Sequence, residues 1–191
     1  MQEKIRAVNG HATKDLRPGL EKLIYADPAL EAPETIRVES VAFEDNEPIP
    51  PLFTVDGERE SPPLRWRGVP DGAAAIVLLV EDADSPTPAP LIHAVAVKEP
   101  GLDDDLIPGA LTDENAAIEG LLLGRNSFHK AEWSPPDPPP GNGPHRYVFE
   151  VYAIDRRPEI DGAPGKQEIL EILRGHVLAK GLLIGTYERI A

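Results

Sequence analysis

Two short apolar runs, at residues 73–80 and 91–97, constrain the fold of this chain more than any other feature. The first run contains only Ala, Ile, Val and Leu and is too short for a stable helix. We therefore predict a strand that is covered on both faces. The second run is also predicted to be a strand, whose alternation places these residues on one face: Leu91, His93, Val95 and Val97. His93 then faces the core, where it needs a hydrogen-bonding partner or a place at the mouth of a pocket.

Patterns typical of strands continue along the chain. Further strands are predicted near residues 35–43, 61–66, 145–154 and 182–187. Between Gly124 and Pro144, six prolines each remove a backbone donor, which predicts a shaped loop rather than a regular element.

Helical spacing is confined to two segments. Apolar residues predict a short helix at residues 18–25 and a longer one at residues 166–180, with Gly181 at its end. No repeat or linker divides the chain. We therefore expect residues 1–191 to form a single all-β domain with a few peripheral helices.

The charge and the cysteine content exclude several classes of function. Acidic residues outnumber basic residues, 33 to 19, and no run of Lys or Arg offsets the net charge of −14. Nucleic acid and anionic membrane surfaces are therefore poor partners. The absence of cysteine excludes disulfides, thiolate metal sites and cysteine nucleophiles. No apolar segment approaches the roughly 18 residues of a membrane span, and no signal peptide is recognisable, so we expect a cytoplasmic protein without membrane insertion.

Two histidines occur in the same local context. His93 and His145 each follow a proline-containing loop and lie at or near the start of a strand, on its apolar face. If their strands are neighbours, both imidazoles would meet Asp82 or Asp84 and the loop at residues 135–140 at one end of a sheet. A carboxylate can hold one ring nitrogen and leave the other facing outward. Such a cluster suits an oxyanion, and a phosphate ester above all.

Other interpretations of these histidines remain open. A core-facing histidine is often a hydrogen-bonded structural residue, and two histidines beside an aspartate are compatible with a metal triad. The sequence contains no G-x-S-x-G, P-loop or H-E-x-x-H motif. Residues 141–143 (Gly-Asn-Gly) carry only part of a dinucleotide fingerprint and precede a strand. We therefore predict a protein that is not an enzyme and has no cofactor, with a metal-assisted hydrolase as the alternative.

Four motifs resemble one known family and occur in the order found in that family. Along the chain they are Ser61-Pro62-Pro63-Leu64-Arg65-Trp66, Asp82-Ala83-Asp84-Ser85-Pro86 with His93, the loop Gly124-Arg125-Asn126 with Pro136-Asp137-Pro138-Pro139, and Pro144-His145-Arg146-Tyr147-Val148-Phe149. Together they resemble the signatures of the phosphatidylethanolamine-binding protein family, which includes the Raf kinase inhibitor proteins, in its compact prokaryotic form. The resemblance covers residues 61–154 well and does not explain an N-terminal extension of about 45 residues.

The resemblance implies a fold and a site. The fold is an antiparallel Greek-key β-sandwich with a few peripheral helices. The site is an anion pocket whose ligand-binding residues, carried over to this chain, are Asp82, Asp84, His93, Pro136, Asp137, Pro138, His145 and Tyr147. Asp84 is expected to tie the loop together and Tyr147 to form part of the pocket wall. Ala83, Lys98 and Asp137 depart from the family pattern. The extra carboxylate of Asp137 is expected either to weaken anion binding or to favour a zwitterionic or cationic ligand.

The function implied is that of a non-catalytic binding protein. Its ligand would be a phosphate or a phospho-headgroup, and its partner a protein kinase or a protease that it regulates. The N-terminal extension and residues 166–187 are expected to supply a homodimer contact. Because charged imidazoles favour an oxyanion, phosphate binding is predicted to strengthen as the pH falls from about 7.5 to about 6.

Overall fold

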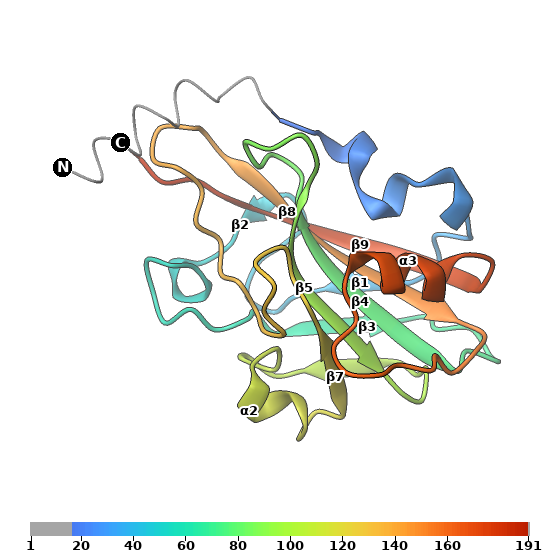
Figure 1. Cartoon of the computed structure of the whole chain (residues 1–191). Coiled ribbons are helices and arrows are strands. Elements are labelled where there is room, and N and C mark those ends of the chain that lie inside the picture. The colour runs from blue at the N-terminus through green and yellow to red at the C-terminus, as the bar shows by residue number, and fades with distance from the viewer. Residues whose placement is uncertain (1–16, 191) are drawn as a thin grey trace.

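A computed structural model of the chain describes residues 17–190, and its largest element is a six-stranded sheet (Figure 1). In spatial order its strands are β2 (Glu47–Pro48), β9 (Val177–Tyr187), β8 (His145–Ile154), β4 (Ala75–Asp82), β5 (Leu91–Lys98) and β7 (Leu121–Gly124). A three-stranded sheet contains β1 (Arg37–Glu39), β3 (Leu64–Arg67) and β6 (Asp104–Leu106), in that order. The chain thus folds mostly into sheet, as predicted.

One strand pair departs from the predicted antiparallel arrangement. All neighbouring strands are antiparallel except β2 and β9, which are parallel. An entirely antiparallel architecture is therefore wrong at this edge of the large sheet. A hairpin forces two consecutive strands to be antiparallel, but β2 and β9 are far apart in the sequence and no hairpin joins them. Their pairing can therefore be parallel. The Greek-key connectivity stays a prediction.

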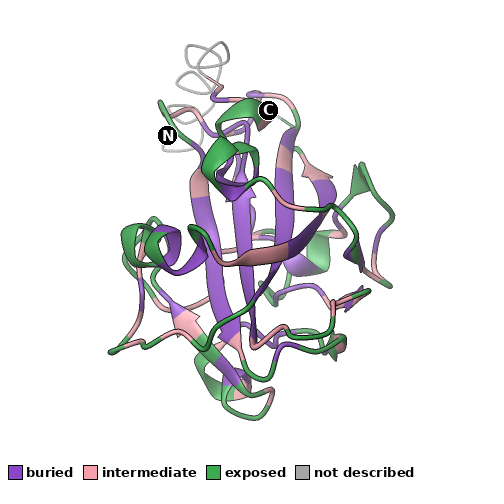
Figure 2. Cartoon of the chain, turned by 90° about the vertical axis from the view of Figure 1, so that its right-hand side faces the viewer, coloured by how far each residue is buried: buried purple, intermediate pink, exposed green. Residues whose placement is uncertain are grey.

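The central strand β4 is buried on both faces, which confirms the prediction for residues 73–80. Ile76, Leu78 and Val80 belong to a core that also contains Trp66 of the small sheet. The alternate residues on the other face join a second core with the N-terminal segment and α3: Ala75, Val77 and Leu79. Figure 2 shows the resulting continuous burial of the central strands. An uninterrupted apolar run is what a strand between two cores requires.

The helices are short and lie outside the large sheet (Figure 1). The α-helices are α2 (Asp113–Ala116) and α3 (Lys166–Leu173), and the 3₁₀ turns are η1 (Leu20–Lys22), η2 (Ile24–Ala26), η3 (Pro28–Leu30) and η4 (Pro51–Phe53). The helix predicted at residues 18–25 is thus a pair of 3₁₀ turns. No helix within residues 17–190 has the length and apolar character needed to cross a membrane.

The segment that sequence motifs left unexplained packs against the sheets. Leu23, Ile24 and Leu30 are buried in the second core, and Val38 and Phe43 are buried in the first. Residues 17–45 are therefore part of the packed structure rather than an appendage. Residues 1–16 of the predicted extension lie outside the described residues.

The predicted helix at residues 166–180 ends earlier than its apolar pattern suggested. It stops at Leu173, Gly175 takes a φ of 75°, and β9 begins at Val177. A positive φ is accessible to glycine without steric cost, so Gly175 reverses the chain. Gly181 is not a helix end but lies within β9, where an added Cβ would approach the Ile36 carbonyl oxygen to 1.8 Å. Glycine is needed there because another backbone segment crosses β9 closely.

Candidate functional site

The ends of three central strands meet at one end of the large sheet. Because β4 is antiparallel to both β5 and β8, the end of β4 lies beside the starts of the other two strands. Asp82 pairs with Leu91 on one side and with Tyr147 on the other. The prediction supposed that the strands carrying His93 and His145 are neighbours. They are not, since β4 lies between them. Both histidines still reach the same site.

A β-bulge determines which face His93 occupies. Val80 pairs with Ala94 and Glu81 pairs with Ile92, so His93 is the extra residue between them. A bulge interrupts the strict alternation of side chains along a strand. Val95 and Val97 therefore pack in the second core, whereas His93 lines a cavity at the sheet end. The prediction that these three side chains share one face is wrong for this reason.

His93 is held at two points by Ser134. The ring Nδ1 lies 2.7 Å from the Ser134 carbonyl oxygen, and the Ser134 N–H donates to the His93 carbonyl oxygen. A carbonyl oxygen only accepts, so Nδ1 carries the proton of a neutral ring and Nε2 carries the lone pair. No hydrogen bond to Nε2 is formed within residues 17–190. Burial lowers the pKa of His93, although the nearby Asp82 opposes this shift.

His145 is more enclosed than the sequence suggested. Its Nδ1 lies 2.8 Å from Asp82 Oδ2, and its Nε2 lies 2.6 Å from Asn142 Oδ1. The ring is completely buried. The expectation that one nitrogen of His145 faces outward is therefore wrong, because Asn142 occupies it. The segment Gly141-Asn142-Gly143 matches part of a dinucleotide motif, and this local pattern does not identify Asn142 as a histidine partner.

Tyr147 lies between the two imidazoles. Its ring meets His93 edge-on at a centroid distance of 5.2 Å and stacks on His145 at 6.5 Å. The hydroxyl is buried and has no hydrogen-bond partner within the described residues. Burial raises the pKa of this phenol far above its usual value, so the hydroxyl keeps its proton and remains a donor. A buried donor without a partner indicates a position where a ligand or water accepts the bond.

These side chains surround a cavity of about 410 Å³. It is lined by Val55, Arg59, Asp82, Pro86, Leu91, His93, Phe128, Ser134, Pro135, Asp137, Pro138, Pro139, His145 and Tyr147. Six of the eight residues predicted to bind ligand line this cavity: Asp82, His93, Asp137, Pro138, His145 and Tyr147. Asp84 and Pro136 do not line it.

Asp84 instead fixes the loop after β4. Both of its carboxylate oxygens accept from the Arg146 guanidinium, at 2.7 and 2.8 Å, and one also accepts from the Arg146 backbone N–H. Burial alone would raise the pKa of Asp84, but these hydrogen bonds outweigh it and hold the pKa below its usual value. Its role is thus to tie the loop to β8, as the sequence predicted. Pro136 also ties its loop to another segment, since its carbonyl oxygen accepts from the Val55 N–H.

The extra carboxylate of Asp137 is neutralised by a residue that sequence reasoning missed. Arg189 donates to Asp137 at 2.9 Å and also pairs with Asp56 at 3.0 Å. The Arg189 backbone carbonyl accepts from Gly141 as well. The C-terminal segment therefore clamps the proline-rich loop. No local signal could have identified Arg189, because its partners lie far away in the sequence.

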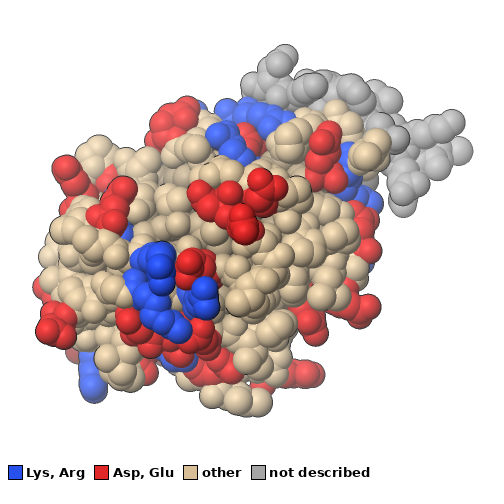
Figure 3. Space-filling model, turned by 180° about the vertical axis from the view of Figure 1, so that it is seen from behind, with Lys and Arg blue, Asp and Glu red and all other residues tan. Residues whose placement is uncertain are grey.

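The sequence left a metal triad open as an alternative and contains no run of Lys or Arg. Within the part of the chain that the structure describes, no group of three or more His, Asp or Glu side chains could hold a metal ion. In the view from behind, Lys and Arg side chains form small groups that border Asp and Glu side chains (Figure 3). On the small sheet, for example, Arg65 pairs with Glu39 at 3.0 Å.

Sequence comparison identifies relatives over most of the chain. Residues 39–188 match the family model described as phosphatidylethanolamine-binding protein. A UPF0098 protein of Methanothermobacter thermautotrophicus is 36% identical over 152 residues, which cover 78% of this chain and 95% of the relative. A UPF0098 protein of Chlamydia muridarum is 33% identical and is covered over 99% of its length.

Solved structures agree with the sequence relatives. A Chlamydia trachomatis protein, described as a putative phosphatidylethanolamine-binding protein homolog, has a TM-score of 0.71 at 31% identity, and the match covers 82% of this chain and 99% of that one. Escherichia coli YbcL, described as a new member of the mammalian family, has a TM-score of 0.73 at 26% identity, with coverage of 81% and 98%.

Proposed function

Because this chain belongs to the phosphatidylethanolamine-binding protein family, in its prokaryotic form, we propose that it is a non-catalytic binding protein whose cavity at the sheet end holds a phosphate or a phospho-headgroup. One observation carries the proposal: the cavity wall presents two polar atoms without partners in the described residues. These atoms are Nε2 of His93 and the hydroxyl of Tyr147. Ligand oxygens that accept from both atoms would satisfy them.

The proton on His93 decides how an oxyanion binds. Since Nδ1 donates to Ser134, Nε2 can donate only when the ring is charged. Burial disfavours that charge, and an anion in the cavity would favour it. Binding is therefore coupled to uptake of a proton by His93. His145 is not available for this role, because both of its nitrogens are occupied.

The carboxylates near the cavity are compensated. Asp82 pairs with His145, and Asp137 pairs with Arg189. Arg59 also lines the cavity, and within residues 17–190 it has no ion pair. The electrostatic cost that Asp137 was expected to impose is thus offset by a neighbouring cation, and the cavity can accept an anion in an acidic protein.

Calorimetric titration with inorganic phosphate and with phosphoethanolamine tests this function. We expect both to bind the full chain, and His93→Ala and Tyr147→Phe each to weaken binding by about tenfold. His176→Ala is the matched control, because His176 is partly exposed and pairs with Asp155 away from the cavity. Equal phosphate affinity in the wild type and in both cavity variants would refute the proposal.

We extend the proposal to the regulation of a protein kinase or protease partner, which rests on family membership alone. A pull-down that depends on an intact His93 would support it. The metal-assisted hydrolase is not favoured, because the donor set leaves one open imidazole nitrogen and the described residues contain no metal-ligating group.

A further inference from the structure

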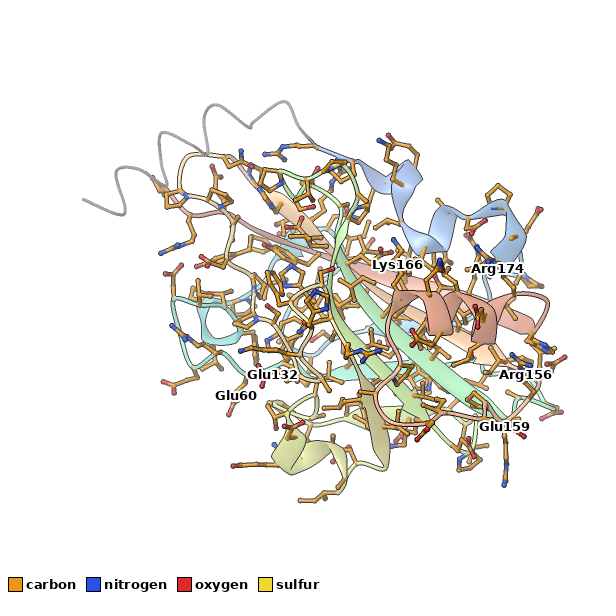
Figure 4. The ribbon with its side chains drawn as sticks, viewed as in Figure 1. Glu60, Glu132, Arg156, Glu159, Lys166 and Arg174 are labelled. Atoms are coloured by element: carbon orange, nitrogen blue, oxygen red, sulfur yellow. The ribbon has the colours of Figure 1, made fainter. Side chains whose placement is uncertain are left out.

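A second cavity, of about 480 Å³, adjoins the first. The two share part of their walls: Arg59, Phe128, Ser134 and Pro135. The other lining residues of the second cavity are Thr112, Asn126, Lys130, Glu132 and Trp133. In Figure 4, Glu132 lies well apart from Lys166, which begins α3. The second cavity thus shares four lining residues with the proposed phosphate site, and it shares only Asn126 with the hollow beside α3.

The indole N–H of Trp133 lacks an acceptor. Trp133 is 5% exposed, and its Nε1 is buried without a hydrogen-bond partner in the described part of the chain. The ring is fixed in place, since it stacks on Phe149 at 6.2 Å and contacts His93 at 6.5 Å. A buried N–H without a partner is rare because it loses its hydrogen bond to water. A ligand acceptor in the cavity that Trp133 lines would supply the missing partner.

The charges around this cavity favour an anion. Arg59 has no ion pair within residues 17–190 and lines both cavities. Lys130 pairs with Glu132 at 3.2 Å, with its side chain 67% exposed. Two cations and one carboxylate thus form the charged wall, in a chain whose formal net charge is −14. The local balance is opposite to that of the whole protein.

We propose that the second cavity binds a second anionic group of the ligand whose phosphate occupies the first cavity. This inference rests on the proposed function and narrows its ligand to a phosphomonoester that carries a carboxylate or another anionic group at its far end. Phe128 lines both cavities and is 49% exposed, so the carbon skeleton that joins the two anionic groups would pack against it. Trp133 and Lys130 would donate to the second group.

Two matched pairs of ligands test the proposal by calorimetry on the full chain. The short pair is 3-phosphoglycerate and glycerol 3-phosphate, and the long pair is 6-phosphogluconate and sorbitol 6-phosphate. Within each pair the skeleton and the phosphate are the same, and a carboxylate replaces a hydroxymethyl group. We expect the acid of at least one pair to bind about tenfold more tightly than its alcohol.

Three variants connect that preference to the second cavity. Trp133→Phe keeps an aromatic ring against Phe149 but removes the N–H, and Lys130→Met removes a cation at an exposed position where folding is not at risk. Both should reduce the acid-to-alcohol preference to about twofold or less, while leaving the affinity for inorganic phosphate unchanged. Glu132→Gln releases Lys130 and should increase the preference. Thermal unfolding checks that Trp133→Phe is folded.

The outcomes separate this inference from the proposed function. If phosphate binds but acids and alcohols bind equally in both pairs, the second subsite is refuted and the phosphate site stands. A preference that survives both Trp133→Phe and Lys130→Met would also refute the subsite. If neither phosphate nor any of these esters binds, both proposals fail.

Discussion

Glu81 and Glu150 form a carboxyl pair in the interior of the protein, on neighbouring strands and completely buried. Each has one buried oxygen, Oε1, without a hydrogen-bond partner among the described residues, and a proton on one of the two carboxyls would let these oxygens bond to each other. Glu81 also accepts from the Ile24 N–H at 2.7 Å, and Glu150 accepts from the Tyr152 hydroxyl at 2.6 Å. Burial, and then the charge of Glu81, raises the pKa of Glu150 well above its usual value. The pair therefore joins the N-terminal segment to the sheet while it holds its proton.

The first prediction concerns stability and pH. A group whose pKa is raised on folding contributes stability that is present below its unfolded value, here 4.5, and is lost as the pH rises through its folded pKa. Glu150→Gln supplies an amide donor near Glu81 and keeps an acceptor for Tyr152, but it cannot ionise. We expect it to be more stable than the wild type by about 1–3 kcal/mol above pH 8, and similar at pH 5. Urea unfolding at both pH values measures this, with the exposed Glu171→Gln as the control. A parallel pH dependence in the variant and the wild type would contradict it.

The second prediction concerns anion binding and pH. Sulfate has no proton to donate near neutral pH, so it can use His93 Nε2 only when the ring is charged. Because the pKa of His93 is lowered below 6.5, we expect sulfate affinity to rise as the pH falls and to continue rising below about pH 6.5, by up to about tenfold per unit. This revises the prediction from sequence, in which both imidazoles contributed. His93→Gln should make the affinity independent of pH, whereas His176→Gln should not change it.

The third prediction concerns the clamp formed by the C-terminal segment. Arg189→Met removes the cation that pairs with Asp137 at the cavity wall at 2.9 Å. We expect phosphate affinity to fall by about fivefold, because the Asp137 carboxylate repels the anion more strongly once this cation is removed. Adding Asp137→Asn to Arg189→Met should restore most of the affinity. If the double variant binds no better than Arg189→Met alone, the electrostatic explanation is wrong and the loss comes from loop movement.

The fourth prediction concerns the glycine in β9. Gly181→Ala would bring a methyl group onto the Ile36 carbonyl oxygen. This oxygen belongs to the backbone, so it cannot move aside unless the segment at Ile36 separates from β9. We expect a loss of at least about 3 kcal/mol in the free energy of unfolding. Gly72→Ala is a graded comparison, since its φ of 89° is strained but its Cβ would meet open space. That variant should lose only about 1 kcal/mol. Similar losses in the two variants would show that the close approach at Gly181 is not the cause.

The main strands could be predicted because their patterns are local. An alternating segment such as β8 or a continuous apolar run such as β4 carries its period in consecutive residues, and the prediction for β8 matched its bounds. The prediction of a helix over residues 166–180 was too long because it, too, relied on a local pattern. Its apolar spacing fits a helix beyond Leu173, but Gly175, with a φ of 75°, ends the helix there.

What the sequence determined by itself is the strand-rich fold, the family, and the set of residue types at the site, including His93, His145, Asp82 and Tyr147. Only the tertiary structure decided what each side chain does there. A bulge turned His93 towards the cavity, Asn142 occupied the free nitrogen of His145, and Arg189 compensated Asp137. Local periodicity reports which side of a strand a residue occupies, whereas hydrogen-bond partners and counter-charges come from segments that meet only when the chain is folded.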